Sequence, residues 1–493
     1  MDLKRTFRSL RNTTIFCVGI KGTGMAALAE LLQKRGALVS GSDTEEKFYT
    51  DQILTELGIP FAEGFRRGNL PQNTDLIIHS AAYQRDSNPE LQEGARRGIP
   101  ILTYPEALGF LSSLSAAAGI AGTHGKTTTA ALCGTIMKGS GLPVSVLTGA
   151  AVSNLGGRST YAGGSTYFIA ETCEYKRHFL HFHPDWLVIT NIEADHLDYY
   201  SGYDDMLDAF TEYIRRLPVN GVLIYCADDS GAAAAAARAA GERKDIRLVP
   251  YGRTADGPFA VTSLRQKAGA VEFSLGGWTK PFTLRVPGAH TVANAAAAAA
   301  ITVQIAEREG VGPEETENCI RRGIEEFTGS SRRSEVVGET GGIVFLDDYG
   351  HHPTEIKTTL AGIRQFYPGR RLIVDFMSHT YSRTAALFNE FATAFTDADA
   401  VIFHKIYGSA REPQQNGQAY RTGPEQVSGE KLYRAARGHL QNAVYFREVM
   451  EARDYCLQML KKGDIFCTLG AGDNWRLGRE LYGTLSGRGA KDK

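Results

Sequence analysis

Short apolar runs recur along the chain, and many of them end in glycine or in a cluster of polar residues. The first run, at 14–19, leads to the turn Gly22-Thr23-Gly24, and apolar residues at helical spacing follow. A second run, at 37–40, ends beside Ser42. This order of strand, glycine turn, helix and strand predicts a βαβ unit with a diphosphate site at its turn. The spacing G-x-x-G-x-G disfavours NAD, and a purely structural turn is a close alternative.

Further apolar runs divide the chain into three parts. In the first part they lie at 75–80 and 99–102, in the second at 116–121, 167–170 and 186–190, and in the third at 343–346, 371–376 and 464–469. A polar, basic stretch near 327–333 is typical of a linker. We therefore expect an α/β protein with an N-terminal Rossmann-like sheet (1–113), a central P-loop ATPase-type sheet (114–327) and a C-terminal Rossmann-like α/β domain (328–493).

The run at 116–121 leads into the most informative segment of the chain. Its residues are Gly122, Thr123, His124, Gly125, Lys126, Thr127 and Thr128, and a helical pattern follows. Backbone N–H groups at such a helix start face an anion, the lysine reaches the terminal phosphates of a nucleotide, and the adjacent hydroxyl can hold Mg²⁺. The glycine spacing differs from the common phosphate loop, yet Gly-Lys-Thr at a helix start is hard to explain by packing.

Acidic clusters follow the two later strands of the central part. Glu171-Thr172-Cys173-Glu174 ends one strand, and Asn191-Ile192-Glu193-Ala194-Asp195-His196 ends the other. Strand ends in a parallel sheet face one crevice, so we expect Glu171 and His196 to lie near the phosphate loop, where they could bind Mg²⁺. The alternative is that both are solvated residues at loop ends.

Three strand ends of the last part are rich in histidine, aspartate, arginine and glycine, which suggests another crevice in use. A zinc site made of Asp348, His351 and His352 is disfavoured, because adjacent histidines seldom both reach one ion and no Cys/His ligand pattern accompanies them.

Composition restricts the class of protein. The chain has 54 basic and 55 acidic residues, so no overall charge recruits nucleic acid or an anionic membrane. Its 7 cysteines form no CxxC pair, which favours a reducing cytoplasm. The first residues lead to no signal-peptide pattern, and we expect no segment of membrane-spanning length.

Taken together, these motifs resemble the Mur ligase family nearly end to end. The motifs are G-I-x-G-x-G-M at 19–25, G-T-H-G-K-T-T-T at 122–129, T-N-I-E-A-D-H at 190–196, D-D-Y-G-H-H-P-T-E at 347–355, H-x-Y-S-R-T at 379–384 and L-G-A-G-D-x-W at 469–475. The resemblance implies a cytoplasmic enzyme, a monomer or weak homodimer. It implies that ATP and Mg²⁺ are used to join L-alanine to the lactyl carboxylate of UDP-N-acetylmuramic acid through an acyl phosphate.

The resemblance also implies roles for individual residues. Those expected to act in catalysis are Lys126, His196, His351 and Arg383. Those expected at ATP are the loop from Gly122 to Thr128, Asn294 beside adenine, and Asp348. Those expected at the sugar nucleotide are Gly22, Thr23, Gly24, Ser42 and Ser80, and at the amino acid or muramoyl group Tyr349, His351 and Arg383. The implied Mg²⁺ ligands are Thr127, Glu171 and His196.

The chain departs from the family pattern in places. The acidic E-A-D-E run reads Glu171-Thr172-Cys173-Glu174, and the F-Q-P-H-R run reads Phe376-Met377-Ser378-His379-Thr380. The second change leaves amino-acid selectivity open. A muropeptide ligase that adds a tripeptide is the nearest rival, followed by a folylpolyglutamate synthetase-like enzyme and a non-enzymatic nucleotide switch. Arg383 has an alternative role as the structural partner of Asp347 and Asp348.

Overall fold

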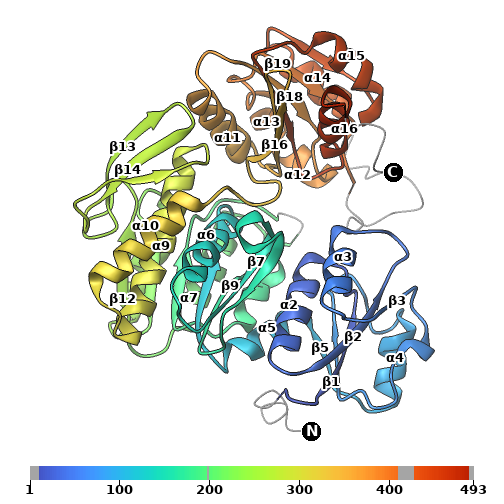
Figure 1. Ribbon diagram of the computed structural model, residues 1–493, viewed down its shortest axis with the longest axis vertical. Coiled ribbons are helices and arrows are strands. Elements are labelled where there is room, and N and C mark those ends of the chain that lie inside the picture. The colour runs from blue at the N-terminus through green and yellow to red at the C-terminus, as the bar shows by residue number, and fades with distance from the viewer. Residues whose placement is uncertain (1–9, 197–198, 409–426, 488–493) are drawn as a thin grey trace.

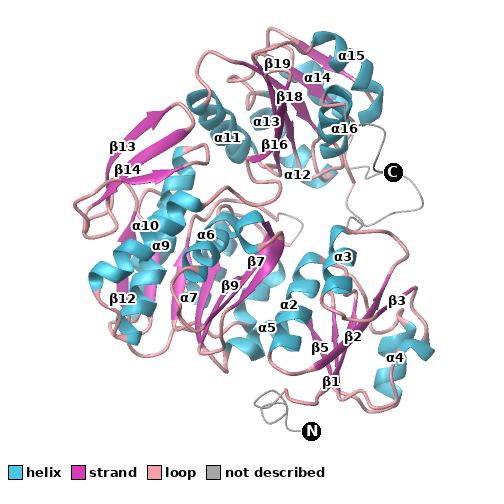
Figure 2. Ribbon diagram, viewed as in Figure 1, coloured by secondary structure: helices cyan, strands magenta, loops and turns pink. Residues whose placement is uncertain are grey.

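The computed structural model describes residues 10–196, 199–408 and 427–487. Within them the chain forms sheets of five, seven, three and six strands. The N-terminal, central and C-terminal parts follow one another around the molecule, with the C-terminal part above the other two in Figure 1. Helices cover the large sheets on both sides (Figure 2), as expected for an α/β protein.

The N-terminal sheet is parallel, with strand order β3-β2-β1-β4-β5. Its strands are β1 (Thr14–Val18), β2 (Leu38–Asp43), β3 (Phe61–Glu63), β4 (Leu76–His79) and β5 (Ile101–Thr103). Its helices are α2 (Thr23–Lys34), α3 (Tyr49–Glu56), α4 (Pro89–Arg96) and α5 (Tyr104–Ser112), with a short 3₁₀ turn, η1 (Arg67–Asn69). The four predicted strands and the glycine turn between β1 and α2 are confirmed.

The central sheet has the order β12-β11-β10-β6-β9-β7-β8, and only its edge strand β8 runs antiparallel to its neighbour among the described pairs. Its strands are β6 (Ala116–Ala121), β7 (Val144–Val152), β8 (Arg158–Ala162), β9 (Tyr167–Glu171), β10 (Trp186–Ile189), β11 (Val222–Cys226) and β12 (Arg247–Tyr251). The helical elements are α6 (Lys126–Lys138), η2 (Ser153–Leu155), η3 (Tyr175–His181), α7 (Tyr203–Ile214), α8 (Ser230–Glu242), α9 (Ala289–Glu309) and α10 (Pro313–Glu326). The phosphate loop thus follows the central strand β6, with the acidic ends of β9 and β10 on either side.

An antiparallel sheet of β13 (Val261–Lys267), β14 (Ala270–Leu275) and β15 (Phe282–Leu284) extends the central part. The sequence analysis did not predict it. Residues of β13 alternate between exposed and partly buried positions and are mostly polar, so no apolar run marks the strand. Figure 1 shows this hairpin beside α11 (Pro353–Phe366), which belongs to the C-terminal part.

The C-terminal sheet has the order β16-β17-β21-β18-β19-β20, parallel except for the edge pair β16–β17. Its strands are β16 (Glu335–Thr340), β17 (Ile343–Asp348), β18 (Arg371–Phe376), β19 (Ala400–Phe403), β20 (Ala443–Tyr445) and β21 (Asp464–Leu469). Besides α11, the helical elements are α12 (Tyr381–Ala386), α13 (Phe388–Ala392), α14 (Gly429–Ala436), η4 (Val449–Ala452), α15 (Arg453–Met459) and α16 (Trp475–Leu485). The three strands predicted here are confirmed as β17, β18 and β21.

Helix α9 corrects the expectation that no segment approaches membrane-spanning length. It has 21 residues, and it is the one helix of the described chain that is long and apolar enough to cross a membrane. In the structure 78% of its apolar window is buried inside the protein. Its alanines at 295–300 are all fully buried, and small side chains let a neighbouring helix such as α6 approach closely. We conclude that α9 is a core helix.

The N-terminal and central parts share one hydrophobic cluster, whereas the C-terminal sheet has clusters of its own on its two faces. Residues of β17 alternate between those faces, with Val344 and Leu346 on one and Ile343 and Phe345 on the other. The shared cluster forms where α2 packs on β7 and β8, and Arg158 of β8 pairs with Glu30 of α2 at 2.7 Å.

A glycine in α5 tests this contact between the N-terminal and central parts. A Cβ on Gly109 would lie 2.1 Å from the backbone oxygen of His181. We therefore expect Gly109→Ala to lower the free energy of unfolding by about 1–3 kcal/mol through overpacking, measured by urea denaturation. Gly241→Ala in α8 is the matched control, because a Cβ there meets nothing within 4 Å and alanine favours a helix. Equal unfolding curves for Gly109→Ala and the wild type would contradict the packing argument.

Candidate active site

Two glycines shape the phosphate loop between β6 and α6. Gly122 has φ +140° and Gly125 has φ +81°, which side-chain-bearing residues rarely adopt. A Cβ on Gly122 would also lie 1.9 Å from Oγ1 of Thr190. The loop therefore turns sharply into the first turn of α6, where free backbone N–H groups favour an anion.

The residues after β10 brace this loop. Thr190 donates its hydroxyl to the backbone oxygen of His124 at 2.5 Å, and Asn191 Oδ1 accepts the His124 N–H at 2.8 Å. The Asn191 backbone oxygen accepts the Thr123 N–H at 3.1 Å. The loop is thus held in its turn by the polypeptide itself, before any nucleotide arrives.

Lys126 is buried and surrounded by oxygen atoms. Its Nζ donates to the backbone oxygens of Gly122 and Thr123, and it lies 3.1 Å and 3.0 Å from the two carboxylate oxygens of Glu174. Burial lowers the pKa of Lys126, but Glu174 and Glu171 outweigh this and raise its pKa. The lysine is therefore charged, and Glu174 neutralises it in the absence of phosphate.

The residues expected to bind Mg²⁺ lie together. Thr127 donates its hydroxyl to Glu171 at 2.8 Å, and His196 Nε2 lies 3.6 Å from Glu174 Oε1. His196 has φ +52°, a backbone region that a non-glycine residue rarely occupies. Together with Lys126 they line one cavity of about 320 Å³, which we name the reaction cavity.

Arg383 reaches this cavity from α12 in the C-terminal part. Its Nε and Nη2 both donate to Asp195 Oδ1, at 3.1 and 3.0 Å, and Nη2 also donates to Oδ2 at 3.3 Å. Burial would raise the pKa of Asp195, but Arg383 and His196 outweigh it and hold that pKa well below its usual range. The alternative role for Arg383 is not seen here, because Asp347 pairs with Arg332 at 3.1 Å instead.

His351 and Tyr349 line the reaction cavity beside Arg383. His351 Nδ1 lies 3.0 Å from the Tyr349 backbone oxygen, so a neutral ring donates there and keeps Nε2 as an acceptor. Burial, against the attraction of Glu355, lowers the pKa of His351 to about 3. The ring is therefore neutral at pH 7 and can accept a hydrogen bond.

A second cavity, of about 360 Å³, is lined by several of the residues predicted at ATP. Asn294 and Asp348 line it together with Thr128 and His290. His290 and Asn294 lie one turn apart in α9 and both line this cavity. This cavity shares His124, Gly125, Arg333 and Glu355 with the reaction cavity, so the two lie side by side.

A third cavity, of about 750 Å³, lies between the N-terminal and central parts. Gly22, Thr23, Gly24 and Ser80 line it as predicted for the sugar nucleotide, and it shares Glu171, Cys173 and Tyr175 with the reaction cavity. Ser42 does not line it. The Ser42 side chain is fully buried and donates to Glu90 Oε2 at 2.5 Å, while its backbone oxygen accepts the Gly19 N–H at 2.8 Å. In this structure Ser42 supports the glycine turn from behind.

Sequence reasoning missed the roles of three acidic residues. Glu174 pairs with Lys126, Asp195 with Arg383, and Glu355 with Arg333 at 3.3 Å. Glu174, Asp195 and Glu355 all lie in the quoted strand-end motifs, and that position was the available signal, because the burial of Glu174 and Asp195 is seen only in the structure. Their partners lie far away in the sequence or in another part, and no local pattern could identify them.

The pair Asp195–Arg383 joins the central and C-terminal parts, so its removal should loosen that contact. We expect Asp195→Asn to weaken the attachment of the C-terminal part by about 2–5 kcal/mol, because Arg383 would stay buried without its counter-charge. Small-angle X-ray scattering of the substrate-free protein should then give a larger radius of gyration. Asp208→Asn is the control, since Asp208 forms an exposed pair with Arg238 within the central part. An unchanged radius in Asp195→Asn would show that other contacts suffice.

Comparison with family models covers most of the chain. The model described as Mur ligase family, catalytic domain, matches residues 14–115, the Mur ligase middle domain matches 120–302, and the Mur ligase, glutamate ligase domain, matches 332–472. The predicted boundaries at 113 and 327 stay predictions.

Individual relatives agree with the family models. A protein from Treponema pallidum named UDP-N-acetylmuramate--L-alanine ligase is 49% identical over 95% of this chain and 96% of its own length. The solved structure of UDP-N-acetylmuramate-alanine ligase from Thermotoga maritima has a TM-score of 0.76 at 23% identity, covering 97% of this chain and 100% of that one. A murein peptide ligase from Psychrobacter arcticus gives 0.64 at 22% identity, covering 98% and 100%. The chain belongs to the Mur ligase family.

Proposed function

We propose that this enzyme joins L-alanine to the lactyl carboxylate of UDP-N-acetylmuramic acid at the expense of ATP, in the cytoplasm. The relatives' printed names support the amino acid and the sugar nucleotide. The phosphate loop supports ATP as the energy source. All seven cysteines are free, as a reducing compartment favours.

The observation that carries the proposal is that two further cavities adjoin the reaction cavity, one at the phosphate loop and one at the end of β9. The reaction cavity shares lining residues with the cavity of Asn294 and with the cavity of Gly22 and Ser80. A nucleotide in the cavity of Asn294 and a sugar nucleotide in the cavity of Gly22 and Ser80 would both direct their reacting ends toward Lys126. A ligase needs this convergence, because three substrates must meet in line and away from water.

A free carboxylate is a poor electrophile, and phosphorylation gives it a leaving group. The chain's part in this step is to position the γ-phosphate and to neutralise the charge that develops on it. Lys126 is placed for this: when phosphate enters, the Nζ that Glu174 now holds can turn to phosphate oxygens. Until phosphate binds, Glu174 therefore supplies the negative charge that keeps the lysine protonated and oriented.

The donor atoms near Lys126 suit Mg²⁺. Thr127 Oγ1 and Glu171 Oε2 are hard oxygen donors 2.8 Å apart, and the ring of His196 faces the same cavity. Bound there, Mg²⁺ would stabilise the negative charge of the phosphates. Thr127, Glu171 and His196 are thus the residues that we propose hold it.

The C-terminal side of the reaction cavity fits a small amino acid. Arg383 offers a guanidinium for its carboxylate, but Nε and Nη2 already bind Asp195. The substrate carboxylate must therefore use Nη1 or displace Asp195. His351 can accept a hydrogen bond from the amine through Nε2. Because its pKa is low, it would orient the amine and would not act as a general base.

The test is phosphate release by the full-length chain. With ATP and Mg²⁺ present, we expect turnover only when UDP-N-acetylmuramic acid and L-alanine are both added. Glycine, L-serine and the tripeptide L-alanyl-γ-D-glutamyl-diaminopimelate serve as alternative acceptors. A preference for the tripeptide would favour the muropeptide ligase, and phosphate release without an amino acid would reject the ligase.

Lys126→Ala should reduce the turnover rate by about 10²–10³-fold, because it removes charge from the transferring phosphoryl group. The matched control is Lys138→Ala at the other end of α6, where the lysine only donates to the Asn154 backbone oxygen at the surface. Circular dichroism of both variants should match the wild type. A near-normal rate in Lys126→Ala would remove the loop lysine from the mechanism.

A further inference from the structure

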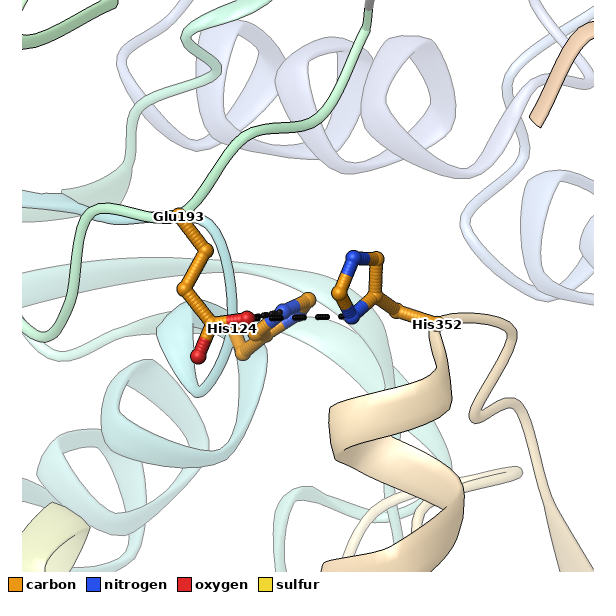
Figure 3. A group of neighbouring side chains, drawn as sticks. All are labelled: His124, Glu193 and His352. Atoms are coloured by element: carbon orange, nitrogen blue, oxygen red, sulfur yellow. Dashed lines mark ion pairs between the residues drawn. The ribbon is translucent and has the colours of Figure 1, made fainter. Parts of the chain in front are cut away.

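A cluster of His124, Glu193 and His352 lies where the phosphate loop meets the C-terminal part (Figure 3). Glu193 Oε2 is 3.6 Å from His124 Nε2 and 3.7 Å from His352 Nδ1. One ligand atom of each residue lies within 4.8 Å of those of the other two. None of the three belongs to the residues that we assign to Mg²⁺.

The spacing suits a small tetrahedral metal ion. Bonds of 2.0–2.1 Å place neighbouring ligand atoms of a tetrahedral zinc ion about 3.3 Å apart. The two separations from Glu193 exceed this by only a few tenths of an ångström, and the separation between the two histidines is at most 4.8 Å, so side-chain rotations would bring all three ligand atoms to one ion. Figure 3 shows the Glu193 carboxylate and both rings turned toward one another.

The two histidines differ as ligands: Glu355 and Glu193 outweigh burial and raise the pKa of His124 to about 9, so a metal ion would displace a proton there, whereas burial lowers the pKa of His352. His124 Nε2 is buried and has no hydrogen-bond partner, while Nδ1 lies 3.1 Å from Glu355 Oε1. A carboxylate behind a ligating histidine fixes its tautomer and raises its basicity, which is the usual arrangement at zinc. His352 Nδ1 accepts only a 3.3 Å bond from the Thr354 N–H, in the first turn of α11.

We propose that His124, Glu193 and His352 form a binding site for a transition-metal dication of the Zn²⁺ type, which pins the C-terminal part to the phosphate loop. Two imidazoles and one carboxylate are a common zinc ligand set, whereas Mg²⁺ prefers oxygen. Of the adjacent histidines only His352 takes part, because His351 turns toward the Tyr349 backbone oxygen. The objection to a site made of adjacent histidines therefore does not apply.

The consequence is control of domain opening. His124 and Glu193 belong to the central part and His352 to the C-terminal part, so a shared ion holds both in the closed arrangement. The ion would also fix His124 within the loop that receives phosphates. Zn²⁺ should thus favour the closed protein even without substrates, and this does not depend on which amino acid the enzyme uses.

The experiment titrates Zn²⁺ into the nucleotide-free full-length protein in competition with a chromogenic chelator. His352→Asn is the main variant, because His352 caps the N-terminus of α11 and asparagine keeps that cap while removing the imidazole. Glu193→Gln removes the carboxylate but keeps an acceptor for Thr354, whose hydroxyl donates to Glu193 at 2.9 Å. The control is His439→Gln, an exposed histidine outside the cluster.

We expect one Zn²⁺ per wild-type chain, retained in excess Mg²⁺ and in His439→Gln, with affinity at least about tenfold weaker in His352→Asn and Glu193→Gln. In Asp195→Asn, whose radius of gyration should be larger, Zn²⁺ should restore the smaller radius, and it should fail to do so when His352→Asn is added. Equal zinc affinity in both variants and the wild type would overturn the proposal, as would full displacement by Mg²⁺. Melting curves without metal establish that the variants fold.

Discussion

The bidentate pair between Asp195 and Arg383 is a buried ion pair that joins the central and C-terminal parts at the reaction cavity. It joins residues 188 positions apart, one beside the phosphate loop and one in the C-terminal part. Both side chains are nearly buried, so each would be costly to leave without the other. Two parallel hydrogen bonds also fix orientation, which a single contact would not. The pair therefore positions the C-terminal wall of the reaction cavity as well as attaching it.

Charge in the reaction cavity is balanced before substrates bind. Lys126 has Glu174, Arg383 has Asp195, and Arg333 has Glu355, so every one of these cations meets a carboxylate. Phosphate and carboxylate groups of substrates must compete with these acids for the same cations. Under the proposed function, substrate binding would be an exchange of anions, and the acidic side chains that it frees would become available to a metal ion.

The sequence predicted the fold where the local pattern was sufficient. Strand β6 and its glycine loop were predicted correctly, because Gly-Lys-Thr at a helix start, after an apolar run, is hard to explain by packing. Strand β13 was not predicted, because its mostly polar residues leave no apolar run. The sequence predictions named only Asn294 of helix α9, near its start. The burial of its alanines, which makes it a core helix, is seen only in the structure.

The sequence predicted several residues that the structure places around the reaction cavity, but it did not predict which of them pair. Thr127, Glu171 and His196 lie together because the ends of parallel strands share one edge of the sheet. Ser42 was predicted at the sugar nucleotide, yet it lies behind the glycine turn, since motif position alone does not say which way a side chain points. The partners of Lys126 and Arg383 required the tertiary structure.

The division of the hydrophobic core has a consequence for how the chain folds. The N-terminal and central parts share the largest cluster, although the other face of the N-terminal sheet has a small cluster of its own, and the C-terminal sheet packs both of its faces with separate clusters. Because cooperativity follows shared apolar contacts, we expect the first two parts to unfold together and the C-terminal part to unfold as a separate unit. During synthesis the phosphate loop could then be complete before the C-terminal part has emerged.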